Sequence, residues 1–232
     1  IAEQRFAVEG QTVVFDWQGA RHETPLALVG GFQAENVALA AALAIATGVA
    51  PEAVFAVLPD LEGVPGRMER VATRRNGGAV YVDYAHTPDA LATALDALRP
   101  HAAGRLAVVF GAGGERDRGK RVLMGAAAAR RADTVIVTDD NPRGEDPAAI
   151  RAEVMRGCPE ASEIGDRAAA ILAGVDALDG PGDALLIAGK GHERGQEVAG
   201  ETRPFDDAEQ ARAAVAALDG VMAALGSAGD DG

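Results

Sequence analysis

The sequence predicts an α/β fold with a mostly parallel sheet, and three observations lead to it. Strand-like runs such as residues 106–110 and 184–188 are apolar at every position, as strands buried on both faces of a parallel sheet are. Segments with helix signals alternate with these runs along most of the chain. Hydrophobic residues make up 48% of the 232 residues and charged residues 25%, which excludes intrinsic disorder for most of the chain.

The first 60 residues have a different pattern from the rest. Residues 12–17 and a second stretch up to residue 29 are strand-like, with a Gln-Gly turn between them. Residues 33–47 are apolar all round, which predicts a buried helix that ends before Gly48, and a short helix follows Pro51. The segment LEGVPG at 61–66 contains two glycines and a proline and is the best linker candidate. We therefore expect a domain boundary between residues 65 and 66.

After this linker, strands and helices alternate regularly. The predicted strands are 79–84, 106–110, 134–138 and 184–188, with a short hairpin around 196–204. The predicted helices are 87–99, 119–131, a helix from Pro147, 166–178 and a helix from Asp206. We expect residues 221–232, which include GSAGDDG, to be disordered.

Polar and glycine-rich loops follow four of the predicted strands directly, beginning at Asp83, Gly111, Asp139 and Gly189. Because ligands of parallel sheets bind beyond the carboxyl ends of the strands, we expect these loops to meet at one edge. Their candidate binding residues are Arg116, Asp140, Asn141, Arg143, Lys190, His192 and Glu193. Guanidinium groups match carboxylates and a glutamate can pair with an ammonium, so the set suits a zwitterionic small molecule. The alternative is a surface ion-pair network.

Charge and composition exclude several classes of protein. The formal net charge of −13 argues against a general grip on nucleic acid phosphates, and no apolar run approaches the ~18 residues of a membrane helix. A single cysteine, Cys158, and an N-terminus without signal-peptide features lead us to expect a cytoplasmic protein. Of the 22 basic residues only Lys120 and Lys190 are lysines, which suggests that these two positions need a compact ammonium.

One segment comes close to a phosphate-binding loop without matching it. Residues 114–121, GERDRGKR, follow the P-loop pattern up to its last position, where Arg121 replaces the serine or threonine that binds Mg²⁺. The loop is also crowded with charged side chains, so we reject a nucleotide-binding P-loop here.

Four motifs in order resemble the C-terminal region of the Mur ligase family: VDYAHTPDAL (82–91), VFGAGGERDRGKRVLMG (109–125), VTDDNPRGEDP (137–147) and IAGKGHERGQ (187–196). Within the family, the motifs are most similar to those of the diaminopimelate-adding ligases. Residues 31–44 and 66–71 resemble the end of the central ATPase domain and the start of the C-terminal domain. The resemblance implies a Rossmann-like C-terminal domain at 66–220, preceded at 1–65 by the end of an α/β ATP-binding domain.

The resemblance also implies an activity and its partners. Members use ATP and Mg²⁺ to form an acyl phosphate on the glutamate of a UDP-N-acetylmuramoyl dipeptide, and the amine of meso-diaminopimelate then attacks it. The family pattern implies that the amino acid is bound by Arg116, Asp140, Asn141, Pro142, Arg143, Gly189 and Glu193. It implies that ATP is approached by Asn36, Arg67, Asp83 and His86, and it assigns no metal ligand to this chain.

The family's P-loop, its uridine-nucleotide domain and its carbamylated lysine have no counterpart in this sequence. The resemblance therefore implies a C-terminal portion of a ligase, which is expected to be inactive alone and to leave Mg²⁺ mainly to the other parts. Two alternatives stay open: a lysine-adding relative, and a non-catalytic Rossmann-like module that binds another anion.

Overall fold

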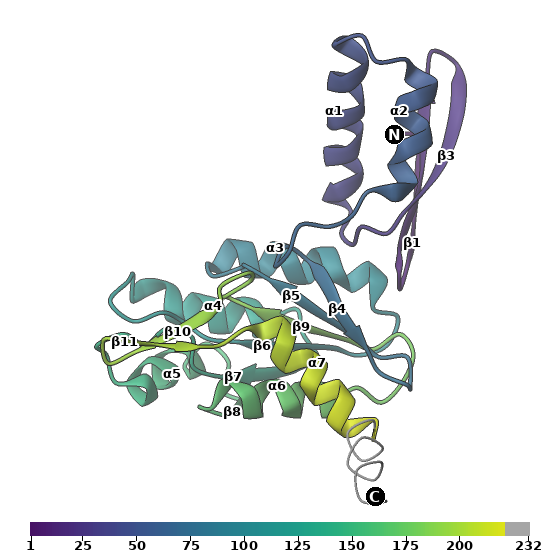
Figure 1. Ribbon diagram of the computed structural model, residues 1–232. Helices are drawn as coiled ribbons and strands as arrows, with labels where there is room; N and C mark the ends of the chain where they lie inside the picture. Colours follow the sequence, from purple (N-terminus) through teal and green to yellow (C-terminus); the bar gives the residue numbers. More distant parts are fainter. Residues whose placement is uncertain (221–232) are drawn as a thin grey trace, which may run out of the picture.

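The computed structural model describes residues 1–220, which form two units joined by a linker (Figure 1). The first unit, residues 1–60, stands above the second unit, residues 66–220, in the view of Figure 1. The tail at 221–232, for which we predicted disorder, lies outside the described residues. No helix within residues 1–220 has the length and apolar character needed to span a membrane.

The first unit packs two helices against an antiparallel sheet. The sheet has the order β1 (Glu3–Ala7), β2 (Gly10–Trp17) and β3 (Ala20–Leu26), and the helices are α1 (Phe32–Ala46) and α2 (Pro51–Val57) with the 3-10 turn η1 (Leu58–Asp60). Its core joins Val13 and Phe15 of β2 to Val37 and Ala41 of α1 and Val54 of α2. The sequence pattern predicted β2 and β3 but not β1, whose residues are mostly exposed and lack an apolar alternation.

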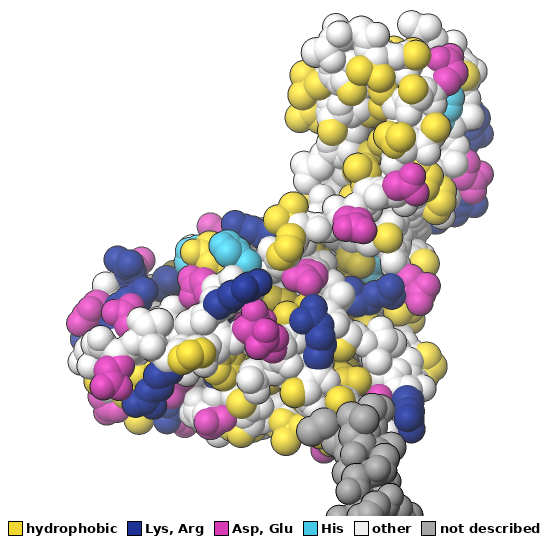
Figure 2. Space-filling view, viewed as in Figure 1, with side chains coloured by type: hydrophobic (Ala, Val, Ile, Leu, Met, Phe, Trp, Pro, Cys, Tyr) yellow, Lys and Arg dark blue, Asp and Glu magenta, His cyan; other side chains and the backbone are white. Residues whose placement is uncertain are grey.

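The prediction that the helix at 33–47 is buried all round is wrong. One side of α1 packs on the sheet through Ala34, Val37 and Ala41, but the side chains of Leu39 and Leu43 on another side are 63% and 58% exposed. Figure 2 shows hydrophobic side chains spread over the surface of the first unit. An apolar helix side therefore faces solvent in this chain.

The second unit is built on a six-stranded sheet of order β4-β5-β9-β6-β7-β8, which confirms the predicted α/β fold with a mostly parallel sheet. The strands are β4 (Glu69–Thr73), β5 (Ala79–Asp83), β6 (Leu106–Phe110), β7 (Thr134–Val137), β8 (Ser162–Glu163) and β9 (Ala184–Ala188). All neighbouring pairs are parallel except β4 with β5. The sequence pattern missed β4 and β8, which are edge strands with little buried apolar surface.

Helices cover both faces of this sheet. The helices on one face are α3 (Pro88–Leu98), α4 (Gly119–Ala129) and α5 (Pro147–Met155), and those on the other are α6 (Arg167–Asp176) and α7 (Asp207–Leu218). A second 3-10 turn, η2 (Arg99–His101), follows α3, and the hairpin of β10 (Gly195–Val198) and β11 (Glu201–Pro204) lies beyond β9. The central strands β6 and β9 are fully buried, which explains their apolar sequences.

A buried ion pair ties the second unit together behind the strand ends. Arg167 begins α6 and Asp207 begins α7, and neither side chain has any exposed area. The guanidinium donates from Nε and Nη2 to the two carboxylate oxygens, both at 2.7 Å, and further to the carbonyls of Asp139 and Ala188. Burial would lower the pKa of Arg167, but the charge and hydrogen bonds of Asp207 keep it above its ordinary value. The pair thus fixes two strand ends relative to two helices.

Candidate functional site

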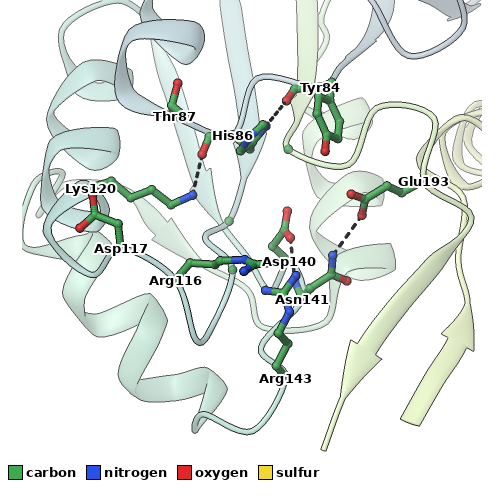
Figure 3. Close-up of a pocket in the computed structure, with 13 residues that line it drawn as sticks. Tyr84, His86, Thr87, Arg116, Asp117, Lys120, Asp140, Asn141, Arg143 and Glu193 are labelled. Atoms are coloured by element: carbon green, nitrogen blue, oxygen red, sulfur yellow. Dashed lines mark hydrogen bonds between the residues drawn. The ribbon is translucent and has the colours of Figure 1, made fainter. Parts of the chain in front are cut away.

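A cavity of about 460 Å³ opens at the carboxyl ends of β5, β6, β7 and β9 (Figure 3). It is lined by Tyr84, His86, Thr87, Gly111, Gly113, Arg116, Asp117, Lys120, Asp140, Asn141, Arg143, Gly189 and Glu193. All four strand-end loops that the sequence predicted to converge contribute to this lining. The predicted convergence is therefore confirmed, because parallel strands end at the same edge of the sheet.

Six of the seven residues that the family pattern implies for the amino acid line this cavity, and the seventh, Pro142, does not. Pro142 is buried, and its carbonyl oxygen would lie 2.0 Å from a Cβ placed on Gly114. It therefore packs the loop against the glycine-rich segment rather than facing a ligand. Two further candidates from the loops also stay outside the lining: Lys190 is fully buried, and His192 is exposed with its ring 5.6 Å from that of Tyr84.

Asp140 carries a carboxylate oxygen without a hydrogen-bond partner among the described residues. Its side chain is 8% exposed, Oδ1 accepts a bond from the backbone N–H of Asn141 at 2.7 Å, and Oδ2 is left unpartnered. Gly189 leaves the room for this oxygen: its φ of +120° disfavours other residues, and a Cβ there would lie 2.5 Å from Oδ2. A buried acceptor without a partner is costly, so this oxygen is suited to a ligand's donor.

Arg143 reaches the cavity from a strained backbone position. Its φ is +53°, and the hairpin holds it there, because Arg143 N–H donates to Glu197 O at 3.0 Å and Ala199 N–H donates to Arg143 O at 2.7 Å. The guanidinium donates from Nη1 to Gly114 O at 2.8 Å and pairs through Nε with Glu197 Oε2 at 3.1 Å. These contacts use two of its five N–H donors, so the side chain is oriented and still has donors for a ligand.

Charged and polar side chains lie next to each other on the cavity wall. Figure 3 shows Arg116 reaching toward Asp140, and Asn141 bonded through Nδ2 to Glu193 Oε2 at 3.0 Å. The pair Arg143–Glu197 is the kind of contact that the ion-pair-network alternative expects. That alternative does not account for the unpartnered oxygen of Asp140.

His86 and Lys120 form another side of the cavity. Lys120 Nζ donates to the backbone carbonyl of His86 at 2.8 Å, and His86 Nδ1 lies 2.8 Å from the carbonyl of Tyr84. Because a carbonyl only accepts, Nδ1 of His86 carries the proton. Burial lowers the pKa of the Lys120 ammonium, and the carboxylates of Asp140 and Asp117 act in the opposite direction.

A second cavity of about 280 Å³ lies where the two units meet. It is lined by Phe32, Gln33, Arg67, Met68, Asp83, Ala90, Thr93 and Ala94. Of the residues implied for ATP, the structure brings Arg67 and Asp83 together here, whereas His86 lines the first cavity and Asn36 lines neither. Asn36 is exposed on α1 and donates to Gln33 Oε1 at 3.1 Å.

The two oxygens of Asp83 both accept backbone hydrogen bonds. They receive the N–H groups of Met68 and Ala85, each at 2.8 Å, and burial raises the pKa of the carboxyl. Asp83 therefore anchors the linker end to the loop after β5, in addition to facing the second cavity.

Sequence reasoning missed several residues that line the first cavity. Tyr84, Thr87 and Asp117 line the wall, but nothing in their local pattern separates them from ordinary loop residues. Arg121, which replaces the P-loop serine or threonine, points away from the cavity: it is fully buried and bonds to Glu145 and Glu153.

Within residues 1–220 there is no group of three or more His, Cys, Asp or Glu that could hold a metal ion. We assign no metal ligand to the described part of the chain.

Comparison with known proteins agrees with this geometry. Residues 66–191 match the family model described as Mur ligase, glutamate ligase domain. The UDP-N-acetylmuramoyl-L-alanyl-D-glutamate–2,6-diaminopimelate ligase of Caulobacter vibrioides is 56% identical over 210 residues, which are 90% of this chain and 43% of that protein. The ligase of the same name from Bradyrhizobium diazoefficiens is 57% identical over 206 residues, which are 89% and 42% of the two chains.

Solved structures are also similar. A structure of a UDP-N-acetylmuramoyl-L-alanyl-D-glutamate–2,6-diaminopimelate ligase superposes with a TM-score of 0.75 at 40% identity, over 94% of this chain and 45% of that one. The UDP-N-acetylmuramate–alanine ligase of Thermotoga maritima shares the fold. It superposes with a TM-score of 0.66 at 18% identity, over 95% of this chain and 45% of that one. The chain spans less than half the length of each of these relatives.

Proposed function

We propose a function from the premise that this chain belongs to the Mur ligase family: it is the C-terminal portion of an ATP-dependent ligase in peptidoglycan precursor synthesis. The ligase joins meso-diaminopimelate to UDP-N-acetylmuramoyl-L-alanyl-D-glutamate in the cytoplasm. The names of the relatives at 56% and 57% identity support this substrate pair. We keep the proposed division at residue 66, with residues 1–65 as the end of the ATP-binding domain.

The observation that carries the substrate proposal is the pairing of free acceptors and free donors on one cavity wall. Asp140 Oδ2 is buried without a partner among the described residues, and the partly exposed carboxylate of Glu193 lines the cavity beside it, so this wall attracts an ammonium. Arg116 and Arg143 supply guanidinium donors for a carboxylate. An amino acid end that carries both an ammonium and a carboxylate, as diaminopimelate does, would satisfy both sets.

The second cavity supports the proposed ATP side. Arg67 would meet phosphate charge, and Asp83 and Gln33, the partner of Asn36, lie on the same wall. The chemistry that ATP supplies when bound is a phosphoryl group for the carboxylate of the dipeptide. His86, on the loop that follows Asp83, and Lys120, at the start of α4, both line the first cavity and would bind groups that reach from one cavity toward the other.

We propose that residues 1–232 alone do not catalyse ligation. The pattern G-x-x-x-x-G-K-[ST], whose backbone cradles ATP phosphates, is not found in the 232-residue sequence. A chimera in which these residues replace the corresponding part of the Caulobacter ligase should regain activity. Product formation by the purified 232-residue chain would contradict the proposal.

Steady-state kinetics of that chimera with meso-diaminopimelate and with lysine test the proposed amino acid substrate. Arg143→Ala should lower kcat/KM for meso-diaminopimelate about 10²-fold, since charge-assisted hydrogen bonds of roughly 1.5–3 kcal/mol each are lost. Ligation of lysine, which lacks the distal carboxylate, should change far less, and Arg143→Lys should restore only part of the loss. Equal losses with both amino acids would mean that Arg143 does not bind the distal carboxylate.

A chimera that prefers lysine would favour the lysine-adding alternative, and a 232-residue chain that binds neither amino acid would favour the anion-binding module.

A further inference from the structure

Lys190 is a fully buried lysine at the edge of the cavity and has no part in the function described so far. It follows Gly189 at the end of β9, and its side chain has no exposed area. The other two large basic side chains that are fully buried, Arg121 and Arg167, hold helices and loops together through carboxylates outside the cavity lining. Lys190 differs from them because both side chains that its ammonium contacts line the cavity.

The first contact of Lys190 determines how the Asn141 amide is oriented. Asn141 Oδ1 accepts from Lys190 Nζ at 2.9 Å and from the backbone N–H of Glu197 at 3.0 Å. Two donors require an acceptor at this position, so the oxygen must lie there and Nδ2 must lie on the other side. A flipped amide would set its N–H groups against two donors and its oxygen against the carboxylate of Glu193.

The second contact determines which oxygen of Glu193 is free. Glu193 Oε2 accepts from Lys190 Nζ at 3.3 Å and from Asn141 Nδ2 at 3.0 Å, and Glu193 N–H donates to Lys190 O at 2.9 Å. The carboxylate is therefore held through Oε2 while 35% of the side chain remains exposed. Oε1 and the second N–H of Asn141 are left for a ligand, with an acceptor and a donor side by side (Figure 3).

We propose that Lys190 is a positioning residue for the amino acid substrate. Its ammonium holds the amide of Asn141 and the carboxylate of Glu193 in the one arrangement that presents an acceptor to the substrate's ammonium and a donor to its carboxylate. This role rests on the proposed function, because it assumes that a zwitterionic amino acid end occupies the cavity. A compact ammonium suits the position, since the larger planar fork of arginine has no open space around a fully buried side chain.

The test is the affinity of the 232-residue chain for meso-diaminopimelate, measured by isothermal titration calorimetry in a double-mutant cycle. Lys190→Met keeps the length of the side chain and removes the ammonium, and we expect it to weaken binding about tenfold or more. Glu193→Gln should weaken binding as well. In the Glu193→Gln background, adding Lys190→Met should weaken binding by a smaller factor than it does alone, because the contact with Glu193 has already been altered and only the contact with Asn141 Oδ1 is newly lost. Arg105→Met, which removes an exposed cation paired with Asp179, controls for the loss of one positive charge and should leave the affinity unchanged.

The outcomes separate the two proposals. Binding by the unaltered chain that survives Lys190→Met, or an equal loss in both backgrounds, overturns the role of Lys190 and leaves the proposed function standing. No binding by the unaltered chain overturns both. If Lys190→Met does not melt cooperatively, Lys190→Gln, which keeps an N–H donor at similar reach, takes its place in the same cycle. It should retain more affinity than Lys190→Ala, and equal losses for Gln and Ala would overturn the role.

Discussion

The two units of the molecule differ in how completely they cover their apolar residues. In the second unit, helices cover both faces of the sheet, and every residue of β6 and β9 is buried. In the first unit, α1 is apolar at all but three of its 15 positions, yet Leu39 and Leu43 are mostly exposed. The apolar pattern of a segment therefore indicates that it can be buried, whereas the neighbouring elements decide whether it is.

The two units also meet through a few polar contacts and a little apolar surface, in which Val29 packs into the core of the second unit. His101 of η2 donates from Nδ1 to Ala7 O at 2.7 Å, and its Nε2 accepts from Gly30 N–H at 3.0 Å. The hydroxyl of Tyr81 donates to Val8 O at 2.9 Å. Most of the stability of the second unit should therefore come from its own core.

The largest effect is expected at the buried ion pair of the second unit. Arg167→Leu leaves the carboxylate of Asp207 buried without its partner, and the free energy of unfolding should fall by about 3–5 kcal/mol. Denaturant unfolding measures the loss. The double variant Arg167→Leu, Asp207→Asn should recover part of it, and a double variant as unstable as the single one would contradict this reasoning. Disruption of the exposed pair Arg105–Asp179 should cost less than about 1 kcal/mol.

Leucine-to-alanine substitution should lower the free energy of unfolding much more in a helix of the second unit than in a helix of the first. Leu95→Ala removes a fully buried side chain from α3 and should cost about 2–5 kcal/mol. Leu43→Ala removes a side chain of α1 that is 58% exposed, and stability should change by no more than about 0.5 kcal/mol. Thermal and denaturant melting of the two variants compare them directly. A large loss at Leu43 would mean that this side of α1 is covered in solution.

A smaller effect is expected where the units meet. His101→Phe leaves Ala7 O and Gly30 N–H without their partner and should cost about 1–3 kcal/mol at pH 7.5. Burial lowers the pKa of His101, so the unfolded chain takes up a proton at a higher pH than the folded chain does. The stabilisation is therefore present above pH ~6.5 and is lost as the pH falls below it. Unfolding measured from pH 7.5 to 5 should show a shallower loss in His101→Phe than in the unaltered chain.

Removal of the whole first unit should change the stability of the second unit least. A chain of residues 66–220 loses the hydrogen bonds from Tyr81 and His101, but these side chains become exposed to water rather than buried without partners. We expect cooperative melting with a loss of about 1 kcal/mol. A soluble chain without a cooperative transition would show that the second unit depends on the first.

The sequence by itself determined the central strands of the sheet and the edge at which the four loops meet. Fully apolar runs marked β6 and β9, and the geometry of parallel strands required the loops with Arg116, Asp140, Arg143 and Glu193 to meet at one edge. These inferences succeed because they depend on local periodicity and on a general rule of sheet topology.

Only the tertiary structure decided which charged side chains are buried and what they contact. Arg167 pairs with Asp207 at a separation of 40 residues, and Lys190 reaches Asn141 across 49 residues. A local pattern carries no record of such partners, so Lys190 looked like a loop residue although it is fully buried. The same limit explains the wrong prediction for α1 and the position of Pro142 outside the cavity. Burial depends on what packs against a residue, and that is settled only when distant segments come together.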